Sequence, residues 1–194
     1  MKLLALRCPE CGNSLTPEND DIVVTCARCF TAVQIGDEGL SQMAVFYIRS
    51  KSRESVTRWL PSWVFRGTVQ ISQRETQGGG SQEQEALRFW SQPRAFYVPA
   101  WEMSVQTAQE IGSGLVVRQP AVTRMAQPPP AALTPVTLAP ADAVKMLEFI
   151  VLAIEADRSD WLKSINFQLD MGEPELLAFP AGDAGLLALG LSLI

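Results

Sequence analysis

The chain has 194 residues, 47% of them hydrophobic, and a formal net charge of −5. This length suits one sizeable domain with a small module attached, and the composition permits an ordinary buried core. Because histidine is absent, the sequence excludes Ser–His and Cys–His catalytic pairs and lacks the usual protein ligand of catalytic metals.

Charge is unevenly distributed along the chain. Residues 1–40 carry 3 basic and 6 acidic side chains, residues 41–135 carry 10 and 6, and residues 136–194 carry 3 and 9. A basic middle and an acidic tail suit either contact between subunits or binding of nucleic acid. The excess of +4 in the middle is too small to decide between these two partners.

Two C-x-x-C pairs, separated by 14 residues, account for every cysteine: Cys8, Cys11, Cys26 and Cys29. Each pair places two thiolates on one tight turn, so two such turns close a tetrahedral shell of four sulfurs. We therefore expect all four to be metal ligands, with no position left open for catalysis. Zinc is the expected metal, although an iron site of rubredoxin type needs the same geometry.

Two other uses of the cysteines are disfavoured. Disulfides need an oxidising compartment, but residues 1–6 reach Arg7 and the first cysteine before an apolar region of signal-peptide length can form. A thioredoxin-like redox pair needs one C-x-x-C at the start of a helix rather than two in short strands. We therefore expect a cytoplasmic protein with a structural metal.

A small antiparallel sheet is expected around the cysteines. Residues 21–25 and 31–35 are rich in β-branched side chains and are predicted to be its strands. The turn signal at residues 36–39 is interpreted as a domain boundary, so that the zinc ribbon spans residues 1–36.

Residues 41–118 are predicted to form a β-rich domain. Apolar and polar residues alternate after Pro61, which is the pattern of a half-buried strand. The glycine-rich residues 77–82 are interpreted as a hairpin tip, with residues 86–90 returning as the partner strand. Residues 111–114 are interpreted as a turn and residues 115–117 as a further strand.

A short motif occurs twice in this region, as Leu60-Pro61-Ser62-Trp63 and Val98-Pro99-Ala100-Trp101. It suggests an internal repeat in which the two segments begin equivalent strands. Trp63 and Trp101 are expected to anchor these strands in the core. The alternative is an aromatic ligand pocket formed by the two tryptophans.

Residues 119–139 are rich in proline and are predicted to be an extended connector that crosses the surface. Pro140 suits the first position of a helix, predicted over residues 140–156. A three-stranded meander is expected to follow, so that residues 140–194 pack on the β-rich domain. Its last segment, residues 186–194, is apolar on both faces and is expected to be a central strand, a subunit interface or a membrane contact. The expected fold class is therefore α+β, with a zinc ribbon, a mainly antiparallel β body and one amphipathic helix.

The four cysteines and the two Pro-x-Trp segments resemble a group of largely uncharacterised bacterial zinc-ribbon proteins. Those proteins join a four-cysteine knuckle to a β-rich body with repeated motifs of this kind. The resemblance covers most of the chain and implies the same organisation, but no particular activity. Ser62 and Ala100 depart from the pattern, which often has a large aromatic residue before the tryptophan.

We do not expect an enzyme, because the sequence has no histidine, no paired carboxylates at a telling spacing and a metal shell without an open position. A buried Glu102 or Lys51 in a deep cleft would reopen that question. The favoured hypothesis is a scaffold or adaptor that binds protein partners and forms homo-oligomers. The alternatives are a nucleic-acid-binding ribbon, disfavoured by the acidic residues 1–40, and a peripheral membrane adaptor.

Overall fold

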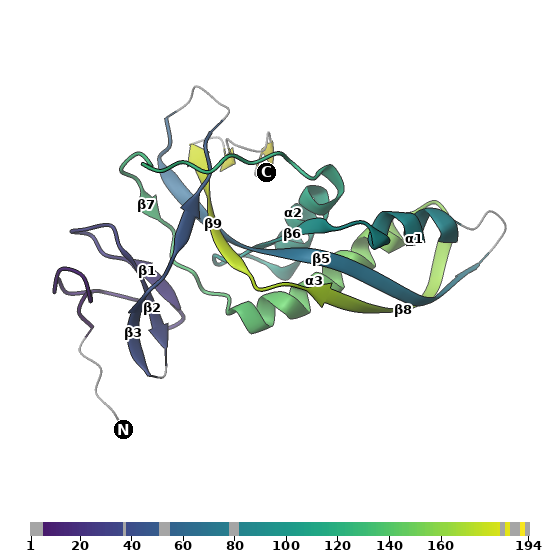
Figure 1. Ribbon diagram of the computed structural model, residues 1–194, viewed down its shortest axis with the longest axis horizontal. Coiled ribbons are helices and arrows are strands. Elements are labelled where there is room, and N and C mark those ends of the chain that lie inside the picture. The colour runs from purple at the N-terminus through teal and green to yellow at the C-terminus, as the bar shows by residue number, and fades with distance from the viewer. Residues whose placement is uncertain are drawn as a thin grey trace.

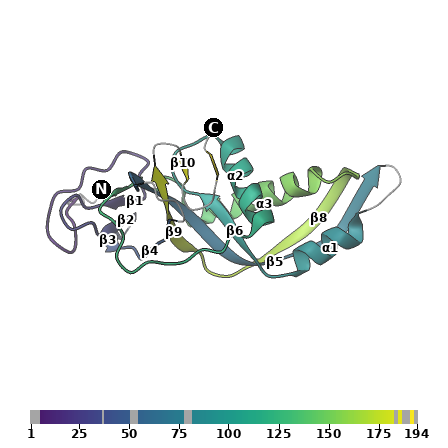
Figure 2. The same ribbon diagram turned by 90° about the horizontal axis from the view of Figure 1, so that it is seen from above.

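The computed structural model describes residues 6–36, 38–50, 55–77, 82–182, 185–186 and 191–192. Within them, a small sheet lies at one end of the molecule, and a larger sheet with three helices forms the body (Figure 1). Figure 2 shows that the body extends away from the small sheet into a long two-stranded arm formed by β5 and β8. The chain therefore combines strands and helices in an α+β arrangement.

The small sheet has three antiparallel strands in the order β1 (Val23–Thr25), β2 (Ala32–Gly36) and β3 (Gly39–Gln42). Gly36 pairs with Gly39, so the turn signal lies inside a hairpin and the sheet continues beyond the boundary expected at residue 36. Gly39 has φ 136°, a backbone conformation that favours glycine. Residues 36–39 therefore connect two strands of one sheet.

The larger sheet is built around β5 (Arg58–Gln77), a strand of 20 residues. The first part of β5 lies between β9 (Glu175–Gly182) and β6 (Arg94–Pro99), and its second part pairs with β8 (Trp161–Met171). Four short strands complete the sheet: β4 (Val45–Tyr47), β7 (Ala132–Leu133), β10 (Gly185–Leu186) and β11 (Leu191–Ser192). Most pairings are antiparallel, while β4 with β9 and β7 with β5 are parallel.

The described chain has three helices where the sequence predicts one: α1 (Glu83–Ser91), α2 (Val105–Arg118) and α3 (Pro140–Ala156). The prediction of α3 is confirmed, with proline in its first turn. The expected strand at residues 86–90 is wrong, because these residues belong to α1. There Ala86 and Trp90, four residues apart, are the buried positions, as expected for one face of a helix. The hairpin expected at residues 77–82 is therefore wrong as well, since β5 is followed by α1 and pairs with β8.

Helix α2 replaces the turn and strand expected at residues 111–117. The Ser104 hydroxyl caps its start by accepting from the backbone N–H of Thr107 at 3.1 Å. Gly112 lies in the middle of this helix, where a Cβ atom would stand 2.9 Å from the Tyr97 carbonyl oxygen of β6 and would clash with the Ile150 side chain of α3. Gly112 is thus present for close packing and does not mark a turn.

We expect Gly112→Ala to lower the free energy of unfolding by about 1–3 kcal/mol, because the added methyl group must push α2 away from β6 and α3. Gly114→Ala, in the same helix, is the matched control. A Cβ there has its nearest neighbour 4.0 Å away, so alanine should stabilise the helix by about 0.5–1 kcal/mol. Urea denaturation measures both, and equal changes for the two variants would contradict the packing at Gly112.

The two Pro-x-Trp segments do not begin equivalent strands, so that prediction is wrong. Ser62 and Pro99 are direct partners in the antiparallel pair β5–β6, which sets the two segments side by side and running in opposite directions. Trp63 is buried, as expected, and its indole N–H donates to the Leu138 carbonyl oxygen at 2.7 Å. Trp101 lies just after β6 and is only half-buried.

The connector and the C-terminal strands pack differently from what the sequence predicts. Leu133 and Val136 of the connector are buried in the main core, so this segment does more than cross the surface. Strands β8 and β9 occur where strands were predicted, but each pairs with a different part of β5 instead of with the other. Most of the last apolar segment, residues 187–190 and 193–194, lies outside the described residues.

A buried cluster of charges joins the elements at the far end of the body. The Arg74 guanidinium of β5 donates from Nε to Glu155 of α3 at 2.8 Å and from both terminal nitrogens to Asp160, which precedes β8. The Trp90 indole N–H of α1 donates to Glu155 at 2.7 Å, and the Gln82 backbone N–H donates to Asp160 at 2.9 Å. The side chains of Arg74 and Glu155 are fully buried. This network therefore ties α1, α3 and the start of β8 to the end of β5.

Candidate metal centre

The first cysteine pair lies on a tight turn that its own backbone closes. The Cys8 N–H donates to the Asn13 carbonyl at 2.8 Å, and the Gly12 N–H donates to the Cys8 carbonyl at 2.9 Å. Gly12 has φ 70°, a conformation that glycine adopts without steric cost. The backbone thus turns back directly after Cys11.

The second pair is built in the same way. The Phe30 N–H donates to the Cys26 carbonyl, and the Cys26 N–H donates to the Thr31 carbonyl, both at 2.9 Å. Phe30, which follows Cys29, has φ 58° and is 54% exposed. Each C-x-x-C is therefore followed by a residue at positive φ. The sequence reveals this at Gly12 but not at Phe30, because an aromatic residue gives no sign of that conformation.

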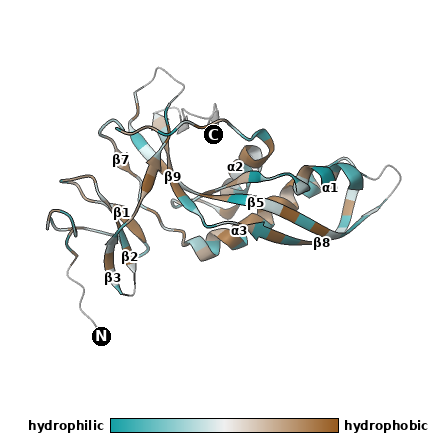
Figure 3. Cartoon of the chain, in the orientation of Figure 1, coloured by the Kyte–Doolittle hydropathy of each residue, from teal (hydrophilic) through white to brown (hydrophobic). Residues whose placement is uncertain are grey.

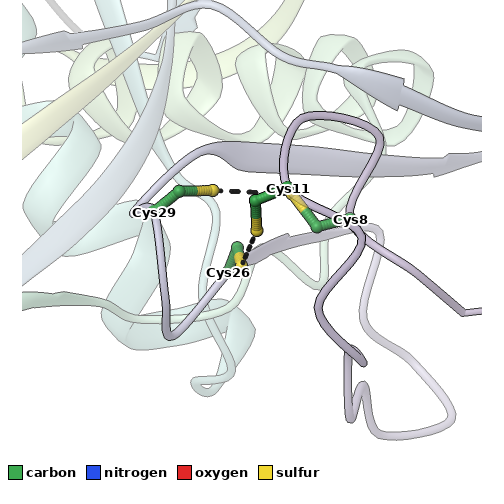
Figure 4. Close-up of side chains that lie close together, drawn as sticks. All are labelled: Cys8, Cys11, Cys26 and Cys29. Carbon is green, nitrogen blue, oxygen red and sulfur yellow. Dashed lines mark hydrogen bonds between the residues drawn. The ribbon is translucent and has the colours of Figure 1, made fainter.

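The two turns bring all four cysteines together (Figure 4). Their Sγ atoms lie within 4.8 Å of one another, and the Cys8–Cys29 and Cys11–Cys26 sulfurs are 3.6 Å apart. A tetrahedral ion with metal–sulfur bonds of about 2.3 Å would separate its sulfurs by about 3.8 Å. The donor set and its spacing therefore fit one metal ion, and four thiolates would fill a tetrahedral shell.

Local hydrogen bonds give the thiols unequal acidity. Hydrogen bonds with the side chain and backbone of Thr31 lower the pKa of Cys29 to about 6, and the Thr31 hydroxyl lies 3.2 Å from its sulfur. The backbone N–H of Cys29 is the main cause that lowers the pKa of Cys26. The Asn13 N–H also lowers the pKa of Cys11, but burial and hydrogen bonds with the other thiols raise it to about 12. Cys26 and Cys29 are therefore more acidic than Cys11, and a bound metal would deprotonate the whole set.

The metal site has a small core of its own and is also attached to the body. Cys8 and Cys26 are buried together with Leu15, Val24 and Val33. On the other side, the backbones of Val23 and Val136 form an antiparallel bridge, with the Val136 N–H donating to the Val23 carbonyl at 2.9 Å. Val23 is fully buried in the main core. The strand that leads into Cys26 is thus shared between the metal module (residues 6–42, with the four cysteines and β1, β2 and β3) and the body.

A cleft of about 940 Å³ lies where the metal module meets the body. Its acidic lining comes from Glu18, Asp20, Asp21 and Glu102, and its apolar lining includes Trp101 and Met103. None of the described residues that line it is lysine or arginine. Trp63 does not line this cleft, so the two tryptophans do not form a common aromatic pocket there, and Glu102 is exposed at its edge.

No helix in the described ranges of the chain has the length and apolar character needed to cross a membrane. A scan against protein-family models, a search of curated proteins and a search of solved structures each find no match to this chain.

Proposed function

We propose that this chain is a zinc-stabilised scaffold or adaptor that associates with itself and binds protein partners. The observation that carries this proposal is the apolar surface on α3 and at the start of β8. Val144, Phe149 and Leu152 of α3 are 38%, 49% and 39% exposed, and Trp161 is 77% exposed. Figure 3 shows hydrophobic segments along α3, β5 and β8 in brown. Water contact with this much apolar surface is unfavourable, so association would stabilise the protein by covering it.

The metal assignment rests on the four sulfurs. Zinc suits a closed shell of thiolates that stabilises a fold, and iron suits the same shell. We expect about one equivalent of zinc in protein purified without added metal, measured by elemental analysis. Iron in its place would change the metal and keep the structural role, whereas less than about half an equivalent of either would contradict the site.

An enzymatic function is not proposed, for two chemical reasons. The sequence supplies no histidine for general acid–base catalysis. All four cysteines lie in one cluster, and a tetrahedral ion bound there would have no free position for a substrate.

The alternative of nucleic-acid binding finds little support near the metal module. Phosphate binding needs lysine or arginine side chains, whereas the cleft where the metal module meets the body is lined by four carboxylates and by no described basic residue. The alternative of peripheral membrane contact depended on residues 186–194, most of which lie outside the described part of the chain.

Light scattering on the full metal-loaded chain tests the proposal. We expect the mass of a dimer or larger assembly that dissociates on dilution. Parallel assays at low salt would use duplex DNA, single-stranded RNA and vesicles of anionic phospholipid, and we expect no binding to any of them. A monomer at every concentration, together with salt-sensitive binding of nucleic acid, would overturn the proposed function.

A further inference from the structure

Strand β8 has an open edge along its whole length. Ten of its 11 residues pair with β5, from the pair of Met171 with Gly67 at one end to the pair of Trp161 with Gln77 at the other. Within the described chain no strand pairs with the opposite edge, which points away from β5 (Figure 1). An open edge presents unpaired backbone N–H and C=O groups to any further strand, and proteins usually block such edges with proline, charges or a covering segment. Strand β8 contains no proline and only two charged residues, Lys163 and Asp170.

A groove runs beside this edge. It has a volume of about 810 Å³ and a mixed lining. The apolar side chains include Val144 and Leu152 of α3 and Ile165, Phe167 and Leu169 of β8, and the polar ones include Glu148, Asn166 and Gln168. The three β8 residues are half-buried, while Asn166 and Gln168 between them are exposed. Successive side chains of a strand point to opposite faces, so the apolar side chains of β8 share one face, on which Phe167 and Leu169 pack against the main core. A strand added at the edge would therefore need apolar residues on that face and polar residues on the other. Strand β8 itself has this alternation.

The charges of β8 are also self-complementary. Ser164 pairs with Glu75 of β5, and Leu162 pairs with the next residue of β5, Thr76. Lys163, which lies between Leu162 and Ser164, is therefore an extra residue in a β-bulge. If two β8 strands met antiparallel about a two-fold axis at Phe167, Ile165 would face Leu169 of the second copy. Lys163 and Ser164 would then lie opposite Asp170 of the second copy. Centring the pairing on Asn166 or Gln168 would remove this opposition of unlike charges.

We propose that a second copy of this chain pairs its β8 with the β8 edge, antiparallel about a two-fold axis at Phe167. The main sheets of the two copies join into one continuous sheet. The apolar side chains of each β8 extend the core of the other copy across the groove, and Lys163 and Asp170 form two ion pairs between copies. This inference rests on the self-association proposed above and identifies its surface.

Disulfide cross-linking between two variants, each with a new cysteine at a different position of β8, tests the register of the pairing without disturbing the core. In the proposed pairing Asn166 faces Gln168 of the second copy, and both side chains are exposed. Directly opposed residues have Cβ atoms about 4.5–5.5 Å apart, close to what a disulfide needs, whereas diagonal neighbours are about 7–8 Å apart. We expect metal-loaded Asn166→Cys and Gln168→Cys proteins to form a covalent dimer on mild oxidation when mixed. Each variant alone is the matched control and should remain largely uncross-linked.

Charge reversal provides the second measurement. Lys163→Glu and Asp170→Lys should each raise the dimer dissociation constant roughly two- to tenfold, because each replaces attraction between exposed charges with repulsion, and the double variant should restore it. A wild-type dimer whose cysteine variants cross-link no better mixed than alone would overturn this surface and leave self-association standing. A chain that is monomeric at every concentration would contradict both this inference and the proposed self-association.

Discussion

Replacing Arg74 with methionine should lower the free energy of unfolding by about 3–5 kcal/mol. The substitution leaves the buried carboxylate of Asp160 without its cation. Glu155 loses the ion pair with Arg74 and keeps the one with Arg158 at 2.7 Å. The apolar side chain cannot replace the three hydrogen bonds that the guanidinium donates to the two carboxylates. We expect the loss to loosen the junction of β5, β8, α1 and α3 first, because these are the elements that the cluster joins.

Urea denaturation measures the change, and Lys145→Met is the matched control. Lys145 forms an ion pair with Asp142 on the outer surface of α3, where both side chains are more than half exposed. Because water screens this exposed pair, its loss should change the free energy of unfolding far less than the loss of Arg74 does. Similar effects of the two substitutions would contradict the buried role of Arg74.

The same cluster predicts how the difference in free energy of unfolding between wild type and Arg74→Met depends on pH. The Arg74 hydrogen bonds hold the pKa of Asp160 well below its usual range. A carboxyl whose pKa is lowered by folding contributes stability above its unfolded pKa of about 4, and this contribution is lost as pH falls toward the folded value. The gap in stability between wild type and Arg74→Met should therefore be full near neutral pH and narrow below about pH 4. A gap that stays constant into acid would show that Asp160 is not held by Arg74.

Replacing Cys26 with serine should remove the metal and unfold the N-terminal module. A serine hydroxyl is a poor substitute for a thiolate, and structural zinc sites supply on the order of 10 kcal/mol of folding free energy in isolated peptides. The small core of Leu15, Val24 and Val33 is too limited to hold β1, β2 and β3 together by itself. Elemental analysis should find the metal lost.

Hydrogen exchange would show how far the unfolding spreads. Protection should disappear over residues 6–42 and at Val136, whose N–H donates to the Val23 carbonyl. The centre of the body, where β5 pairs with β6 and β9, should stay protected because the cluster of Leu60, Val64, Tyr97 and Phe179 on one side of it contains no residue of the N-terminal module. Arg28→Ser is the control, since this exposed residue lies between Cys26 and Cys29 and is not a ligand. Retention of one metal per chain by Cys26→Ser would contradict the four-sulfur site.

The features that could be predicted from the sequence are those set by residues close together in the chain. Each C-x-x-C closes through hydrogen bonds that span only a few residues, so the spacing was enough to predict that the four sulfurs meet. Helix α3 could be predicted because Pro140 fixes its start and its apolar residues recur at helical spacing. The strand after Pro61 could be predicted for the same reason, because the alternation of apolar and polar residues is a local pattern.

Segments whose local signals conflict take their conformation from contacts with residues far away in the chain. Gly112 and Gly114 favour a turn, yet α2 forms because Gly112 lets it approach Tyr97 and Ile150. Residues 86–90 form a helix because Ala86 and Trp90 lie against the body, with Trp90 bonded to Glu155, 65 residues away. Arg74 meets its carboxylates across 81 and 86 residues, and no local pattern specifies such pairs. The open edge of β8 also depends on distant contacts, because β8 pairs with the second part of β5 while β9 pairs with the first part. These pairings follow from the packing of the whole core. The free energy gained by burying apolar surface depends on the arrangement of the complete chain and not on the preference of any one segment.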